Sequence, residues 1–250
     1  MQMDLPLLLL VTTATFLIAG TIKGIAGIGM PTIALGLMTL VLAPRTAVAI
    51  ILFPLIVSNA WQFWRAGDMW GAIKRYRWFI AVMMVTIFIS ATLSAAASDR
   101  VIYAVLGVVI LLFVAVNVMS PPPPLPRRFD TIGQIVLGGL TGLFGGLAAI
   151  YAPGVAIYLS ARKVDKDEMV RATGLLVLAG SLPLLAGYVS QNLVSGRLAL
   201  VSLLMVFPTL LGFQIGERVR AHLSEQRFRS VFFVVFFVLG LNLIRKAIMG

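Results

Sequence analysis

The chain contains no cysteine, a single histidine and few charged residues. Of its 250 residues, 12% are charged and 60% are hydrophobic, whereas an average soluble domain is about 25% charged and about 45–50% apolar. The missing cysteines exclude disulfides, thiolate chemistry and thiol-ligated metal sites, and His222 stands alone in a basic loop. The low charge excludes water as the main solvent, because one soluble core cannot bury this much apolar surface.

Acidic residues are also scarce: 9 Asp and Glu stand against 20 Lys and Arg, for a net charge of +11. All the acidic residues fall in loops or at segment ends, which argues against a cation pathway or a carboxylate proton relay within the membrane. The basic residues lie in short loops without aromatic interleaving, so we expect no nucleic-acid partner. Without a His/Cys cluster, a buried carboxylate pair or an activated serine, we expect neither an enzyme nor a cofactor.

Long apolar segments dominate what is present. Most of them approach the roughly 20 residues that span a bilayer as a helix. Stretches free of Asp, Glu, Lys and Arg cover residues 5–22, 24–44, 46–64, 78–98, 101–119, 131–161, 172–196 and 198–216, with a shorter one at 230–244. The sequence therefore predicts an all-α polytopic membrane protein with the lipid bilayer as its surroundings.

One stretch, residues 131–161, is too long for a single crossing. A continuous helix over it would be about 46 Å long, against a hydrocarbon core of about 30 Å. Glycines and prolines interrupt both this stretch and the start of the chain. They are Gly142, Gly145, Gly146, Pro153 and Gly154 in this stretch, and Gly20, Gly24, Gly27, Gly29 and Pro31 near the start. We predict a short re-entrant or broken helix in each half, a geometry that membranes tolerate where it is buried or lines a cavity.

The distribution of Lys and Arg indicates how the chain crosses the bilayer. If each short segment returns the chain to the side it came from, one side holds 14 Lys and Arg and the other holds 5, with Lys23 at the break uncounted. If the segments do not return, the split is 10 against 9. The rule favours the returning topology, with the richer side cytoplasmic and both termini outside.

This topology gives each half an odd number of crossings, so the second half enters the membrane from the opposite side. We predict two inverted repeats, residues 1–119 and 131–250, joined by a Pro-rich cytoplasmic linker at 120–130. Consecutive prolines in the linker favour an extended chain over a helix.

The two halves also share a glycine pattern. Aligning Gly24 with Gly142 places Gly20 on Gly138 and brings the two prolines together. An inverted repeat with matched interrupted segments is typical of a secondary transporter that binds its substrate near the midplane. The alternative is that the glycines only let helices approach closely.

These glycine-rich openings resemble those of the TauE/SafE family of sulfite and organosulfonate exporters. The first opening runs from Gly20 to Pro31 and the second from Gly138 through Gly146 to Pro153, and the likeness covers nearly the whole chain. The resemblance implies an inner-membrane permease that moves a small anion, such as sulfite or a sulfonated or carboxylated organic acid, outward. The sequence leaves the substrate, the coupling ion and homo-oligomer formation open.

Lys23 is the first candidate for a contact with the anion. It is the only basic residue of the first apolar stretch and directly precedes the glycines, where short-helix N-termini would add N–H donors. The alternative is a lysine that snorkels from the end of a helix. The other predicted substrate-binding residues are Gly24, Gly27, Gly29, Pro31, Asn59, Thr141, Gly142, Gly145, Gly146 and Pro153.

Asn59 belongs to a polar group with Ser58 and Gln62, for which interhelical hydrogen bonding is the simplest interpretation. Thr141 occupies the repeat position equivalent to Lys23, so a site built from both would be asymmetric. Two functions remain open: an anion permease, and a membrane scaffold or assembly partner without transport. Polar groups that converge at the breaks favour the permease, whereas apolar packing there favours the scaffold.

Overall fold

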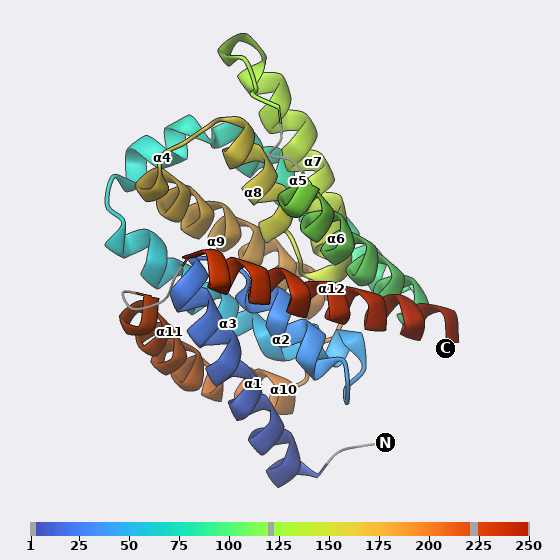
Figure 1. The fold of residues 1–250 in the computed structure, drawn as a ribbon. Helices are drawn as coiled ribbons and strands as arrows, with labels where there is room; N and C mark the ends of the chain where they lie inside the picture. Colours follow the sequence, from blue (N-terminus) through green and yellow to red (C-terminus); the bar gives the residue numbers. More distant parts are fainter. Residues whose placement is uncertain (1–3, 120–122, 221–224, 250) are drawn as a thin grey trace.

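The computed structural model describes residues 4–119, 123–220 and 225–249, and every regular element in this part of the chain is helical (Figure 1). His222 and the first two prolines of the predicted linker lie outside it. The first half contains α1 (Leu5–Ala26), α2 (Met30–Met38), α3 (Pro44–Arg65), α4 (Met69–Arg75), α5 (Arg77–Ser94) and α6 (Asp99–Met119). A 3₁₀ turn, η1 (Arg127–Phe129), precedes α7 (Asp130–Ala148), α8 (Ala152–Ala161), α9 (Lys166–Ser190), α10 (Gly196–Leu204), α11 (Val206–Arg220) and α12 (Glu225–Met249).

Six helical segments of the described chain are long and apolar enough to cross a bilayer, which confirms the prediction of an all-helical, multi-pass membrane protein. The two segments formed by α3 and α9 are 67% and 72% buried, whereas the other four are 33% to 39% buried. α3 and α9 pack against each other and are the centre of the molecule. The short helices α2 and α8 pack beside them, each against its own half's long central helix.

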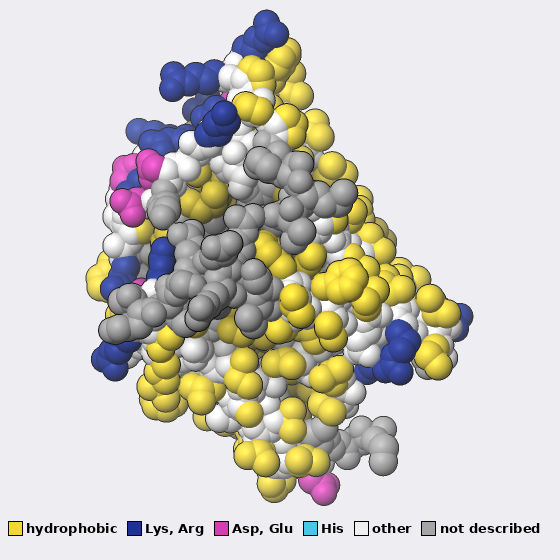
Figure 2. Space-filling view, viewed as in Figure 1, with side chains coloured by type: hydrophobic (Ala, Val, Ile, Leu, Met, Phe, Trp, Pro, Cys, Tyr) yellow, Lys and Arg dark blue, Asp and Glu magenta, His cyan; other side chains and the backbone are white. Residues whose placement is uncertain are grey.

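The outer helices α5, α7, α11 and α12 expose rows of large apolar side chains. Figure 2 shows these side chains as a broad hydrophobic surface, with Lys and Arg gathered mainly at the upper left of the view. A surface of this kind is stable only when lipid rather than water covers it. The outer helices therefore form the lipid-facing layer.

Helices α1 and α11 lie side by side with their backbones in direct contact. A Cβ atom added at Gly216 would lie 2.0 Å from the carbonyl oxygen of Thr21, and one added at Gly24 would lie 2.2 Å from that of Phe213. No side chain fits at either distance. The glycines of both helices are spaced by four residues and face each other, as in small-residue interfaces of membrane helices.

α7 packs on α5 through glycines in the same way. A Cβ atom at Gly142 would lie 2.6 Å from the Met83 carbonyl oxygen, and one at Gly146 would lie 2.4 Å from that of Ile87. The chain turns at residues 149–151, within the predicted segment but beyond these glycines. α7 continues through these glycines to Ala148, because they serve close helix approach and the chain turns only after it.

Ion pairs join several helix ends into one group, here called the basic end. Arg65 at the end of α3 pairs with Glu217 of α11 at 2.8 Å, and Arg75 of α4 pairs with Glu168 of α9 at 2.5 Å. The Tyr76 hydroxyl donates to the same Glu168 carboxylate at 2.6 Å. Burial, and then this hydrogen bond, raise the pKa of Tyr76, so the phenol keeps its proton and remains a donor.

A second group of helix ends lies together at the opposite end. Arg45 at the start of α3 donates to the Ser94 carbonyl oxygen at the end of α5, 3.0 Å away. Lys246 of α12 donates to the Thr39 carbonyl oxygen at the end of α2, 2.5 Å away. Both cations satisfy carbonyl groups at helix C-termini, where the helix dipole favours positive charge.

The close approach of α1 and α11 predicts a position-specific cost for adding a methyl group. Gly216→Ala should lower the free energy of unfolding by about 1–3 kcal/mol, because the new Cβ meets backbone atoms that cannot move aside. Gly196→Ala is the matched control, since nothing lies within 4 Å of its Cβ position, and should leave stability unchanged. Thermal unfolding of both variants in detergent measures this, and equal midpoints would contradict the packing.

Candidate functional site

The first break turns the chain back directly after Lys23. α1 ends at Ala26, and Gly27 takes a left-handed backbone conformation (φ 77°) while donating its N–H to the Lys23 carbonyl oxygen, 2.7 Å away. Gly29 is also left-handed (φ 98°), and Pro31 lies in the first turn of α2. Only glycine takes two such conformations without a steric penalty, so residues 27–29 reverse the chain within the protein.

Lys23 is buried, with 2% of its surface exposed. Its Nζ donates to Ser58 Oγ at 3.1 Å and to Asn59 Oδ1 at 2.7 Å, and lies 5.9 Å from the centre of the Phe213 ring. In the described chain no carboxylate forms an ion pair with it. Snorkelling requires an exposed ammonium group and does not fit this geometry. A buried charge without a counter-ion costs several kcal/mol, so the position favours a nearby anion.

Ser58, Asn59 and Gln62 lie on one face of α3, because residues three and four apart are neighbours on a helix. The Asn59 Nδ2 donates to the Leu55 carbonyl oxygen at 2.7 Å, which turns its Oδ1 toward Lys23. The Gln62 Nε2 donates to the carbonyl oxygen of Val170 on α9 at 2.9 Å. The buried Oε1 of Gln62 has no hydrogen-bond partner.

A cavity of about 200 Å³ lies beside this polar face. Its lining consists of Gly24, Gly27, Gln62, Arg65, Ala66, Val170, Phe213, Glu217 and Arg220. Because a water molecule takes up about 30 Å³ in the liquid, this volume is large enough for a small organic anion. The Arg65 and Glu217 side chains are 49% and 39% exposed and form a two-bond ion pair of 3.0 and 2.8 Å. The cavity therefore opens at the basic end.

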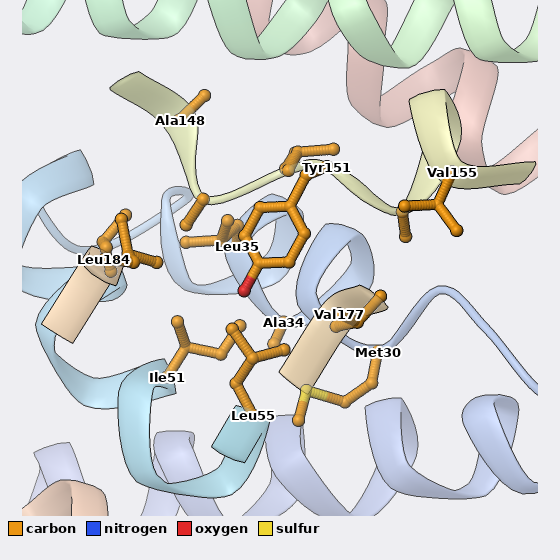
Figure 3. Close-up of a cluster of buried hydrophobic side chains, with 14 of the residues drawn as sticks. Met30, Ala34, Leu35, Ile51, Leu55, Ala148, Tyr151, Val155, Val177 and Leu184 are labelled. Atoms are coloured by element: carbon orange, nitrogen blue, oxygen red, sulfur yellow. The ribbon is translucent and has the colours of Figure 1, made fainter. Parts of the chain in front are cut away.

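The second break is filled by apolar side chains (Figure 3). Ala149 takes a left-handed conformation (φ 53°) after α7, and the Tyr151 side chain, 1% exposed, lies in the space beyond. Around its ring Figure 3 labels Met30, Ala34 and Leu35 of α2, Ile51 and Leu55 of α3, and Val177 and Leu184 of α9. The Tyr151 hydroxyl makes no hydrogen bond of ordinary geometry. The cavity lined by Gly24 and Gly27 therefore adjoins the first break and not this one.

The structure divides the predicted site residues into two groups. Gly24 and Gly27 line the cavity, Lys23 and Asn59 are hydrogen-bonded to each other, and Gly29 and Pro31 shape the turn. In the second half, Thr141 lies against Gly154, Gly145 lies against Tyr151, Gly142 and Gly146 contact α5, and Pro153 begins α8. The second group thus supports packing around the second break.

The profile of the family described as "Sulfite exporter TauE/SafE" matches residues 12–243, nearly the whole chain. The chain belongs to the TauE/SafE family. This finding confirms the resemblance seen in the two glycine-rich openings. No curated protein and no solved structure matches the chain. Because TauE/SafE proteins are transporters, this member is a membrane transport protein, and its family is not one of enzymes.

Some cavity residues of this TauE/SafE protein escaped the sequence prediction. Phe213 and Glu217 come from α11, which only the glycine contacts bring next to α1. Arg65 and Arg220 look in the sequence like ordinary loop cations that set topology. Gln62 gave a usable signal, because it follows Asn59 by one helical turn and therefore shares its face.

The Tyr151 hydroxyl makes no hydrogen bond of ordinary geometry, and this predicts the effect of removing it. Tyr151→Phe should leave the thermal unfolding midpoint unchanged or raise it, because an unsatisfied buried hydroxyl contributes no hydrogen bond. Tyr158→Phe is the matched control: it removes a bond of 2.8 Å to the Asp130 carboxylate and should cost about 1.5–3 kcal/mol. Loss of transport in Tyr151→Phe at undiminished stability would instead put this hydroxyl in the substrate site.

Proposed function

We propose that this protein exports a small oxyanion, such as sulfite or an organosulfonate, which binds in the cavity between Lys23 and the basic end. The single observation that carries the proposal is the buried Lys23 ammonium group, held only by neutral oxygens beside a cavity. Family membership supports an exporter of this class. The cavity opening at the end where most Lys and Arg lie supports loading from the cytoplasm.

The charges around the cavity support an anion as cargo. Arg65 is neutralised by Glu217 at the mouth, which leaves Arg220 as a further cation of the lining. With Lys23 buried beside them, the charged groups of the site sum to a net positive charge. A cavity of one sign within low-dielectric walls raises the local concentration of the opposite charge, and an oxyanion would also accept hydrogen bonds from these donors.

Alternating access through two inverted repeats is the mechanism we infer. The contacts of the two halves match: α1 packs on α11 as α7 packs on α5, α2 on α3 as α8 on α9, and α10 on α3 as α4 on α9. Gly20 meets the Thr209 carbonyl group as Gly138 meets that of Phe79. α1 runs toward the basic end and α7 runs away from it, which supports inversion. Rocking of one such unit against the other would move the opening from one end to the other.

We assign the basic end to the cytoplasm and both chain termini to the outside. The end of the predicted linker lies at the basic end, because Gln134 near the start of α7 donates to the Arg75 carbonyl oxygen, 3.1 Å away. The contacts of Lys246 hold the end of α12 at the opposite end. This grouping of helix ends agrees with the topology in which the short segments return, the one that the positive-inside rule favours.

Removing the Lys23 charge tests the site. Lys23→Met keeps much of the side-chain length, so the half-saturation concentration for sulfite should rise about ten- to a hundredfold, as expected for the loss of a charge-assisted hydrogen bond. Lys23→Arg should retain part of the activity. The measurement is counterflow of labelled sulfite in proteoliposomes with equal amounts of reconstituted protein.

The control for this experiment is Lys74→Met, which removes an exposed lysine at the same end of the molecule and should transport like the wild type. Unchanged transport by Lys23→Met would remove Lys23 from the site. Absence of any sulfite counterflow in the wild type, together with the absence of binding by other small anions, would favour the scaffold.

Single cysteines in this otherwise cysteine-free chain test the topology. Lys74→Cys and Pro124→Cys, at exposed positions of the basic end and the linker, should resist an impermeant thiol reagent added outside intact cells. Arg197→Cys, exposed between α9 and α11, should react. Labelling of Pro124→Cys from outside would overturn the inverted arrangement.

A further inference from the structure

Gln62 combines burial with an unused acceptor at the cavity. The residue is 3% exposed and forms part of the cavity lining. Its Oε1 is buried and has no partner, although a buried carbonyl oxygen normally accepts at least one hydrogen bond. Leaving such an acceptor empty costs free energy, so the site favours a ligand group that donates to it.

The direction of the Gln62 amide is fixed by its surroundings. Its Nε2 donates to the Val170 carbonyl oxygen at 2.9 Å. Exchanging the two ends of the amide would set one carbonyl oxygen against another and lose this bond. The orphan acceptor is therefore a property of the site.

Gln62 and Arg65 line the cavity, and the Lys23 ammonium group is bonded to the same face of α3. Lys23 is bonded to Ser58 and Asn59, and Gln62 lies on the same face of α3 one turn closer to the basic end. Arg65 follows one turn further on and also lines the cavity. An anion here would meet cations on two sides and a lone acceptor between them.

We propose that Gln62 makes the site selective for anions that carry a hydrogen-bond donor of their own, such as hydroxylated sulfonates and protonated oxyanions. This inference rests on the proposed function. The anionic oxygens accept from Lys23 or the arginines, while the ligand's hydroxyl donates to Gln62 Oε1. An anion without a donor leaves this buried acceptor unpaired, and sites with buried polar groups reject such analogues strongly.

Two sulfonates that carry the same single negative charge differ only in one hydroxyl group. Isethionate, 2-hydroxyethanesulfonate, carries a hydroxyl that ethanesulfonate lacks, and both fit a cavity of about 200 Å³. We expect isethionate to inhibit sulfite counterflow by the wild type at a concentration about five- to a hundredfold lower than that of ethanesulfonate. This factor corresponds to pairing one buried acceptor. In Gln62→Met, which lacks the acceptor at similar length, the two inhibition constants should become equal.

Gln134→Met is the matched control, because Gln134 is also a 3% exposed glutamine that bonds between helices but lies away from the cavity. It should keep the wild-type ratio. If Gln62 only tied α3 to α9, its replacement would shift both constants together and keep the ratio, which would overturn the proposal.

If Gln62→Met fails to fold, the ratio of the two sulfonates' inhibition constants in the wild type still tests the proposal. Equal inhibition by isethionate and ethanesulfonate contradicts it. Sulfite counterflow in the same vesicles separates this failure from a failure of the function. If counterflow persists while the ratio is one, only the selectivity is refuted. If sulfite is not transported and neither sulfonate binds, the proposed function fails and the selectivity with it.

Discussion

The backbone contact between α1 and α11 sets the position of the groups that α11 brings next to Lys23 and the cavity. Glycines allow the two helices to approach until carbonyl groups of one meet the Cα atoms of the other. This approach brings Phe213 against the ammonium group and Glu217 to Arg65 at the cavity mouth. Larger side chains at the glycines would separate the helices, and α11 would then contribute nothing to the site.

The partners of Lys23 hold its buried side chain without forming an ion pair with it. Two neutral oxygens, from Ser58 and Asn59, accept hydrogen bonds from the Lys23 side chain but offer it no counter-charge. A carboxylate in the same position would form a buried ion pair, satisfying the lysine permanently and competing with any incoming anion. For the proposed export, neutral partners would also keep binding reversible, since the anion must leave again after crossing.

The helices and their membrane character could be predicted from apolar run length, because a bilayer imposes its thickness on the sequence. The first break was predictable too, since Gly27 and Gly29 take left-handed conformations, which favour glycine. The second break lies within the predicted segment but beyond its glycines: Gly142 and Gly146 look like the same signal, but they contact α5 and the turn falls on Ala149. A glycine that allows close packing and a glycine that ends a helix look alike in a sequence. They differ in the residues that lie opposite them in the fold, and a single sequence does not show these residues.

The difference between the two breaks follows from the cost of burying charge. Were the proposed repeats identical, a second lysine would stand at Thr141 and a second cavity would open toward the other end. Each buried ammonium group carries its own desolvation penalty, and two in one low-dielectric core would also repel each other. Tyr151 and its aliphatic neighbours fill the second break, which avoids both the desolvation penalty and the repulsion and gives that half a closely packed core. Two similar helical frames thus differ in that one of them carries a buried lysine, and this is the frame to which we assign the anion.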